Sequence, residues 1–237
     1  MKTLLFLLLL AGVTLAQTKP AELKKAKADH AKADAKLNVA YKAAMAAMED
    51  AGKAELKKDQ RAWLEYRDDL AKAQVHEAAD DIEKPESSAA YWDMMAGLSD
   101  ERTEWLGSYT KELPEGLTGE WMDSHGGHVY LQERKDGVAF GIDVVRTRAF
   151  NLGGIGGLAK KTATGADYTE KVPADEKREP CKLTFTVDAS GNLEVKSENS
   201  EPFHGNRAYF DGTYRKVAKL KKPVDTEHAP NDPEAAK

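Results

Sequence analysis

The sequence predicts an α+β protein, an N-terminal antiparallel helical bundle followed by a small antiparallel β-barrel or meander. Two observations carry this prediction. From residue 20 to about residue 109 helix breakers are few, and apolar residues recur with helical spacing. Beyond Pro114 the apolar residues alternate with a period of two instead, and short turn motifs separate the alternating runs.

The chain begins with the pattern of a secretory signal peptide. Lys2 precedes an apolar run from Leu4 to Val13, and small residues follow it up to a cleavage point before Gln17. The run is too short to persist as a membrane anchor, and no cysteine near Gln17 suggests lipid attachment. Residues 1–16 are therefore expected to be removed, which leaves a periplasmic or secreted protein without stable membrane insertion.

Composition limits the partners of the mature chain. Of the 35 basic residues only Lys2 lies in the first sixteen, so 34 remain against 40 acidic residues, a formal charge of −6. This charge disfavours nucleic acid as a partner and mildly favours a basic one. Because Cys181 is the only cysteine, no disulfide can form within the chain, and stability must come from packing.

Residues 17–112 are expected to form the helical domain from three apolar stripes, which bury best against one another in an antiparallel bundle. The first helix is expected to stop at Gly52, and the third to start at Pro85 and Ser87–Ser88. The segment from residue 18 to residue 36 is rich in Ala and Lys and is either an extension of the first helix or partly disordered. The stripes consist of Leu37, Tyr41, Ala44 and Met48; of Leu56, Trp63, Leu70 and Gln74; and of Tyr91, Met94, Leu98, Trp105 and Tyr109.

Residues 115–217 are expected to form the β domain, because several short alternating runs joined by tight turns are typical of a meander or small barrel. Residues 218–237 have charge and proline but no apolar pattern, which predicts a disordered tail. The alternating apolar positions are Val138, Phe140, Ile142 and Val144, then Leu183, Phe185 and Val187, then Leu193 and Val195. The turns are expected at His125–His128, Asp136–Gly137 and Ser190–Asn192.

Three patterns in the sequence are candidates for catalytic or ligand-binding sites. His76 and Glu77, followed by Asp80, lack the second histidine of a helical zinc-hydrolase motif, so an exposed acidic helix end explains them better. His125 and His128 bracket two glycines, which favours a hairpin over a metal site. The glycine run 153–157 lies among strands with the wrong spacing for a phosphate loop, so a closely packed strand is expected. No cofactor and no catalytic residue is predicted.

The stretch LKKDQRAWLEYRDDLA, residues 56–71, concentrates specific residue types on one predicted helix. Trp63 and Arg67 lie at i and i+4 and share a face with Gln60, while Tyr66 and Asp68 lie to either side. One interpretation makes Trp63 a core anchor, with Arg67 and Asp68 pairing to neighbouring helices. The other makes these five residues a binding surface.

This stretch carries a resemblance to a known family. Leu37, Asn38 and Tyr41, followed by Gln60-x-x-Trp63-x-x-Tyr66-Arg67-Asp68, resemble the N-terminal domain of LprI-type lysozyme inhibitors over about residues 30–110. The resemblance implies an exported helical module, and family members usually carry a cysteine where this chain has Ala71. The β domain, with Gly119-Glu120-Trp121 and the run 211–214, is loosely similar to lipocalin-like barrels.

Two functions follow as hypotheses. The first is a binding protein that captures a lysozyme-like wall hydrolase through Gln60, Trp63, Tyr66, Arg67 and Asp68, or through the loop with Arg146 and Arg148. The second is a small-molecule carrier or sensor whose barrel holds the ligand and whose helices act as a scaffold. A metal-dependent hydrolase built on the histidines is a third and weaker interpretation.

Overall fold

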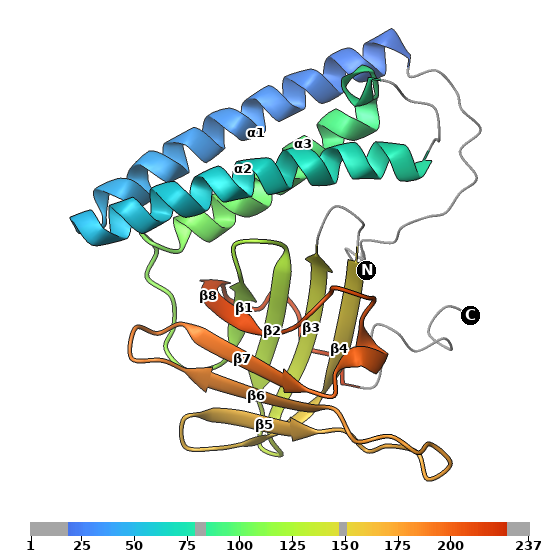
Figure 1. The fold of residues 1–237 in the computed structure, drawn as a ribbon. Coiled ribbons are helices and arrows are strands. Elements are labelled where there is room, and N and C mark those ends of the chain that lie inside the picture. The colour runs from blue at the N-terminus through green and yellow to red at the C-terminus, as the bar shows by residue number, and fades with distance from the viewer. Residues whose placement is uncertain (1–18, 79–83, 147–150, 227–237) are drawn as a thin grey trace.

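The computed structural model describes residues 19–78, 84–146 and 151–226, and it confirms the α+β class. Three helices precede an eight-stranded barrel, and they lie across one end of it (Figure 1). The predicted signal peptide and Arg148 lie outside the described residues. The elements are α1 (Pro20–Ala46), α2 (Asp50–Ala78), the 3-10 turn η1 (Pro85–Ser87), α3 (Ala89–Gly107), β1 (Gly119–Met122), β2 (Gly127–Glu133), β3 (Val138–Arg146), β4 (Asn151–Lys161), β5 (Gly165–Thr169), β6 (Lys182–Val187), β7 (Leu193–Glu198), η2 (Glu201–Phe203) and β8 (Gly212–Ala218).

The first helix confirms one of the two alternatives for its start and differs from its prediction at its end. It begins at Pro20, so the Ala/Lys-rich segment is a helical extension, and small residues such as Ala26 and Ala33 form its buried side. The predicted stop at Gly52 is wrong, because α1 ends at Ala46 and Gly52 lies in the first turn of α2. A glycine close to a helix end could mark a stop or a start, and here the turn at residues 47–49 is made without one.

The third helix follows its prediction closely. Pro85 opens η1, and the Ser88 hydroxyl caps α3 by accepting a hydrogen bond from the Ala90 amide at 3.2 Å. Leu98 and Trp105 are buried, and Trp105 packs with Leu37 and Trp63 of the other two helices. The three stripes therefore meet in one core, as the periodicity indicates.

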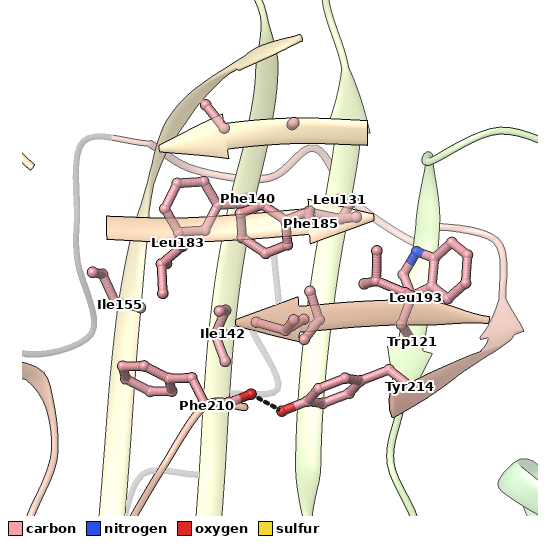
Figure 2. Packing of buried hydrophobic residues seen from close by; sticks show 14 of the residues in the cluster. Trp121, Leu131, Phe140, Ile142, Ile155, Leu183, Phe185, Leu193, Phe210 and Tyr214 are labelled. Atoms are coloured by element: carbon pink, nitrogen blue, oxygen red, sulfur yellow. Dashed lines mark hydrogen bonds between the residues drawn. The ribbon is translucent and has the colours of Figure 1, made fainter. Parts of the chain in front are cut away.

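All eight strands pair antiparallel with their neighbours, and pairing of β1 with β8 closes the barrel. Closure decides between the two predicted arrangements and removes the exposed edges that a meander would keep. The predicted inward positions of β3, β6 and β7 are buried, apart from the partly buried Val187, and their side chains contact one another across the interior (Figure 2). The largest of the buried interior side chains are Trp121, Phe140, Phe185, Phe210 and Tyr214.

The glycine-rich strand β4 is a closely packed strand, as expected, rather than a phosphate loop. A Cβ atom at Gly157 would lie 2.9 Å from the Tyr168 ring and 3.2 Å from the Phe140 ring. A Cβ at Gly153 would lie 3.1 Å from the Phe210 ring. These glycines leave room for aromatic side chains in a barrel of only eight strands.

The structure describes the chain after β8 up to residue 226, and over these residues the prediction of a disordered tail is wrong. Val224 is buried against the barrel, its amide donates to the Gln132 side chain at 3.1 Å, and its carbonyl accepts from Arg134. One apolar residue and a few hydrogen bonds, among them one from the Lys221 amide to Glu120, hold this segment, and no local sequence pattern indicates them. Residues 227–237 lie outside the described part of the chain.

Candidate functional site

Two of the five motif residues are buried inside the helical bundle, and Gln60, Tyr66 and Asp68 are partly exposed. Trp63 is 3% exposed and Arg67 is 8% exposed. The Arg67 guanidinium pairs with Asp68 at 3.0 Å and with Asp34 of α1 at 3.5 Å. Gln60 accepts a hydrogen bond from Arg102 at 2.9 Å. These contacts match the interpretation of the motif as core and ion pairs, and binding by its residues stays a prediction.

Arg102 of α3 completes this core. Its guanidinium lies 5.3 Å from the centroid of the Trp63 ring and 4.1 Å from that of Trp105, and it forms an ion pair with Asp59. Burial lowers the pKa of Arg102, although Asp59 opposes that effect. A cation held between two indole rings fixes how α2 and α3 lie against each other.

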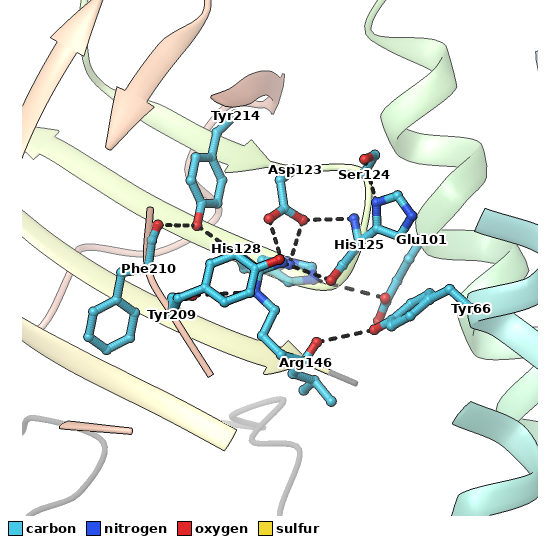
Figure 3. A network of polar contacts seen from close by, with 12 residues as sticks. Tyr66, Glu101, Asp123, Ser124, His125, His128, Arg146, Tyr209, Phe210 and Tyr214 are labelled. Atoms are coloured by element: carbon cyan, nitrogen blue, oxygen red, sulfur yellow. Dashed lines mark hydrogen bonds and ion pairs between the residues drawn. The ribbon is translucent and has the colours of Figure 1, made fainter. Parts of the chain in front are cut away.

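Tyr66 is the member of the motif that leaves the bundle and contacts the barrel. Its hydroxyl donates to the Val145 carbonyl of β3 at 3.2 Å, and its ring meets the His125 ring edge-on with centroids 5.4 Å apart. Both partners lie at one end of the barrel, where the β1–β2 turn reaches the helices (Figure 3). We call this contact region the seam, comprising Tyr66, Glu101, Asp123, His125, His128 and Arg146.

Gly126 of the β1–β2 turn makes the close approach of Tyr66 possible. It has a φ of +79°, and a Cβ there would lie 2.4 Å from the Tyr66 hydroxyl and 2.7 Å from the Val145 carbonyl oxygen. The predicted hairpin at His125–His128 is confirmed, and its glycine serves both the turn and the docking of α2.

Replacing Gly126 by Ala should destabilise the protein by about 2–4 kcal/mol, because backbone strain adds to the loss of the Tyr66 contact. Gly191 offers a matched control, since it has the same φ of +79° with no atom within 4 Å of an added Cβ. Gly191→Ala should cost about 1 kcal/mol from strain alone. Urea unfolding of both variants measures the difference, and equal losses would contradict a role for Gly126 in the seam.

Arg146, predicted as a binding residue of a loop, is buried at the end of β3 with a side chain that is 3% exposed. It forms an ion pair with Asp123 at 2.5 Å and donates to the His125 carbonyl at 2.8 Å. It also donates to the Tyr209 carbonyl and the Tyr214 hydroxyl, both at 3.3 Å. The prediction that Arg146 is presented on a loop is wrong: the strand extends through residue 146, and the arginine organises the barrel end from within.

Asp123 holds the same end together from the β1–β2 turn. One carboxylate oxygen accepts from the backbone amides of His125 and Gly127, each at 2.8 Å, and the other faces Arg146. A carboxylate satisfied by two amides and a guanidinium gives a rigid turn. The analysis of the sequence did not single out this aspartate, because its partner lies 23 residues away on another strand.

His128 and Glu101 form the other ionisable pair of the seam. The His128 Nε2 atom lies 3.9 Å from a Glu101 carboxylate oxygen of α3. Burial lowers the pKa of His128, but the hydrogen bond and charge of Glu101, with the charges of Asp123 and Asp143, outweigh it and leave the pKa raised. The protonated histidine therefore stabilises the contact between α3 and β2.

This pair predicts a pH dependence of stability. A histidine whose folded pKa is raised contributes stability that is complete below its unfolded pKa of about 6.5 and is lost as the pH rises through the folded value. Stability should therefore fall above about pH 6.5, and Glu101→Gln should flatten that fall. Urea titrations across pH 5–9, with the exposed neighbour Glu104→Gln as control, test this; an unchanged pH profile in Glu101→Gln would contradict it.

The two histidines of the β1–β2 hairpin have different contact partners. His125 contacts Ser124 and Tyr66, whereas His128 contacts Glu101. Among the described residues no three His, Cys, Asp or Glu side chains gather in a way that could hold a metal ion. The side chains of His76 and Glu77, and all of Asp80, lie outside the described part. Cys181 is packed in the barrel core, and burial raises the pKa of its thiol to about 12, which leaves it unreactive.

Comparison with known proteins finds one match. Residues 14–106 match the family described as lysozyme inhibitor LprI, which confirms the resemblance read from the helical motif. The match covers the helical region and less than half of the chain. No curated protein and no solved structure matches this chain. No helix in the described residues is long and apolar enough to cross a membrane.

Proposed function

We propose that this protein, whose helical region matches the lysozyme inhibitor LprI family, is an exported, non-catalytic inhibitor of lysozyme-like wall hydrolases. The family match over residues 14–106 is the observation that carries the proposal. The signal-peptide pattern supports export to the periplasm or to the outside of the cell, where such an enzyme acts on the wall. Inhibition then requires only that a surface of the protein occupies the cleft that admits the sugar chain.

Net charge supports this partner. The mature chain carries a formal charge of −6, so its field attracts a basic hydrolase and raises the rate of association. A test at two ionic strengths separates this long-range effect from the contact itself, because salt screens the first far more than the second.

For the motif we propose a supporting role in binding. Trp63 and Arg67 are buried, and Gln60 and Asp68 are engaged by arginines, so the motif shapes the bundle and sets Tyr66 against the barrel. The surface that meets the hydrolase then lies elsewhere on the protein, and the motif holds that surface in place.

The test uses the mature protein, residues 17–237, against a panel of lysozymes of different structural types. We expect inhibition of peptidoglycan clearing by at least one of them and a matching dissociation constant by calorimetry, in the nanomolar to low micromolar range, on the order of −8 to −12 kcal/mol. Absence of binding to every member of the panel would overturn the proposal and leave the helical motif as architecture.

The alternative of a small-molecule carrier receives no specific support from the barrel interior. Phe140 contacts Phe185 and Tyr168 with ring centroids 5.1 Å and 4.8 Å apart, and Trp121 and Tyr214 lie in the same packed cluster. Large side chains of the barrel interior therefore pack on one another. Native mass spectrometry that shows a co-purified ligand would restore the carrier hypothesis.

A further inference from the structure

We propose that the loop before β8 is the part of this protein that enters the cleft of the bound hydrolase, with Arg207 facing the catalytic carboxylates and Tyr209 as the apolar anchor. We call the surface formed by residues 205–209 together with Leu152 the Arg207 turn. The inference rests on the proposed function, for which it supplies the contact surface.

Exposed apolar side chains gather at this turn. Tyr209 is 49% exposed and Leu152 is 47% exposed, the two highest values among the large hydrophobic side chains of the described barrel. They belong to neighbouring segments, because the Gly205 amide donates to the Leu152 carbonyl at 2.8 Å and Gly153 pairs with His204. An exposed tyrosine two residues from an exposed arginine is typical of a protein-binding hot spot, and the exposed leucine of the neighbouring segment adds apolar area.

Arg207 supplies an uncommitted positive charge at the tip of this turn. Its side chain is exposed and forms no ion pair within the described residues, a state that it shares with Arg61 of α2. Its φ is +68°, a left-handed conformation that is uncommon for a residue other than glycine. Such strain recurs at functional positions, because surrounding structure must hold it in place.

The surrounding structure holds the turn from both sides. The buried Arg146 donates to the Tyr209 carbonyl, and its guanidinium lies 4.6 Å from the centroid of the Tyr209 ring (Figure 3). The next residue, Phe210, is buried, and its carbonyl accepts from the Tyr214 hydroxyl at 2.7 Å. The Ala208 amide donates to the Gly205 carbonyl at 3.0 Å. A preorganised turn loses little conformational entropy on binding.

The chemistry of the hydrolase cleft fits this turn. Glycoside hydrolases place two carboxyl groups on either side of the scissile bond. A guanidinium binds carboxylates through paired hydrogen bonds, and an aromatic side chain beside it can occupy a sugar subsite. The acidic body of the inhibitor therefore attracts a basic enzyme, while one unpaired arginine is complementary to the enzyme's acidic centre.

The experiment compares Arg207→Glu and Tyr209→Ala in the full mature chain with two matched controls, Arg61→Glu on the exposed side of α2 and Leu158→Ala on the barrel. Inhibition of the lysozyme that binds the wild type is measured for each, and far-UV circular dichroism and thermal midpoints confirm folding. Each turn variant should raise the inhibition constant at least about tenfold, and the controls should stay within about twofold. An N-acetylglucosamine oligomer should compete with the wild type for binding.

The outcomes separate the two proposals. Inhibition by the wild type that persists in both folded turn variants, or binding that the oligosaccharide does not displace, would overturn the Arg207 turn and leave the inhibitor function standing. Failure of the wild type to bind any lysozyme would overturn both. Loss confined to the turn variants would support the inference.

Discussion

Replacing Asp123 by Ala should destabilise the protein by about 3–5 kcal/mol, because it leaves Arg146 buried without its counter-ion. The aspartate is 13% exposed at its side chain and faces a guanidinium that is 3% exposed. The change also removes the acceptor for the His125 and Gly127 amides, so the β1–β2 turn loses its organisation. Urea unfolding followed by tryptophan fluorescence measures the loss, since Trp121 lies on the adjoining strand.

The control for this prediction is Asp167→Ala on β5, an exposed aspartate, which should change stability by less than about 0.5 kcal/mol. If Asp123→Ala lowered the free energy of unfolding as little as the control does, Arg146 would have another partner. The ion pair with Asp123 would then not be what stabilises this end of the barrel. Because Arg146 also supports Tyr209, the folded fraction of Asp123→Ala should inhibit less well than the wild type even at low temperature.

Replacing Trp63 by Ala should cost about 3–5 kcal/mol, because it removes a fully buried indole and leaves a cavity at the centre of the bundle. The ring also lies 5.4 Å from the Arg67 guanidinium and 5.3 Å from that of Arg102, so two buried cations lose their aromatic partner. Circular dichroism at 222 nm during urea unfolding reports on the helices.

Leu64 is the matched control, since it is the adjacent residue on α2 but is 36% exposed. Leu64→Ala should cost less than about 1 kcal/mol. A stable Trp63→Ala variant that no longer binds a lysozyme would reverse the present assignment and make the motif a contact surface. An unstable variant supports its role in the core.

Some features could be predicted because their signal is local. The period-two pattern at Val138–Val144 and the turn at Asp136–Gly137 each depend on a few consecutive residues, and both are confirmed. Gly52 shows the limit of such signals, because a glycine between two helices does not say which of them it belongs to. Arg146 shows the second limit. The sequence analysis assigns it to a binding loop, whereas the distant carboxylate of Asp123 makes its burial possible.

The sequence by itself determined the α+β class, the helical bundle with its family motif, and the antiparallel strands of the second domain, since each rests on periodicity within one segment. Only the tertiary structure decided that the strands close into a barrel, that Tyr66 joins the helices to it, and that Arg207 remains uncommitted while Arg146 is paired. These features depend on contacts between residues that lie far apart along the chain. The free energy of burying a charge, or of packing a side chain against a distant turn, depends on the partner that folding brings into contact with it. No local sequence pattern identifies that partner.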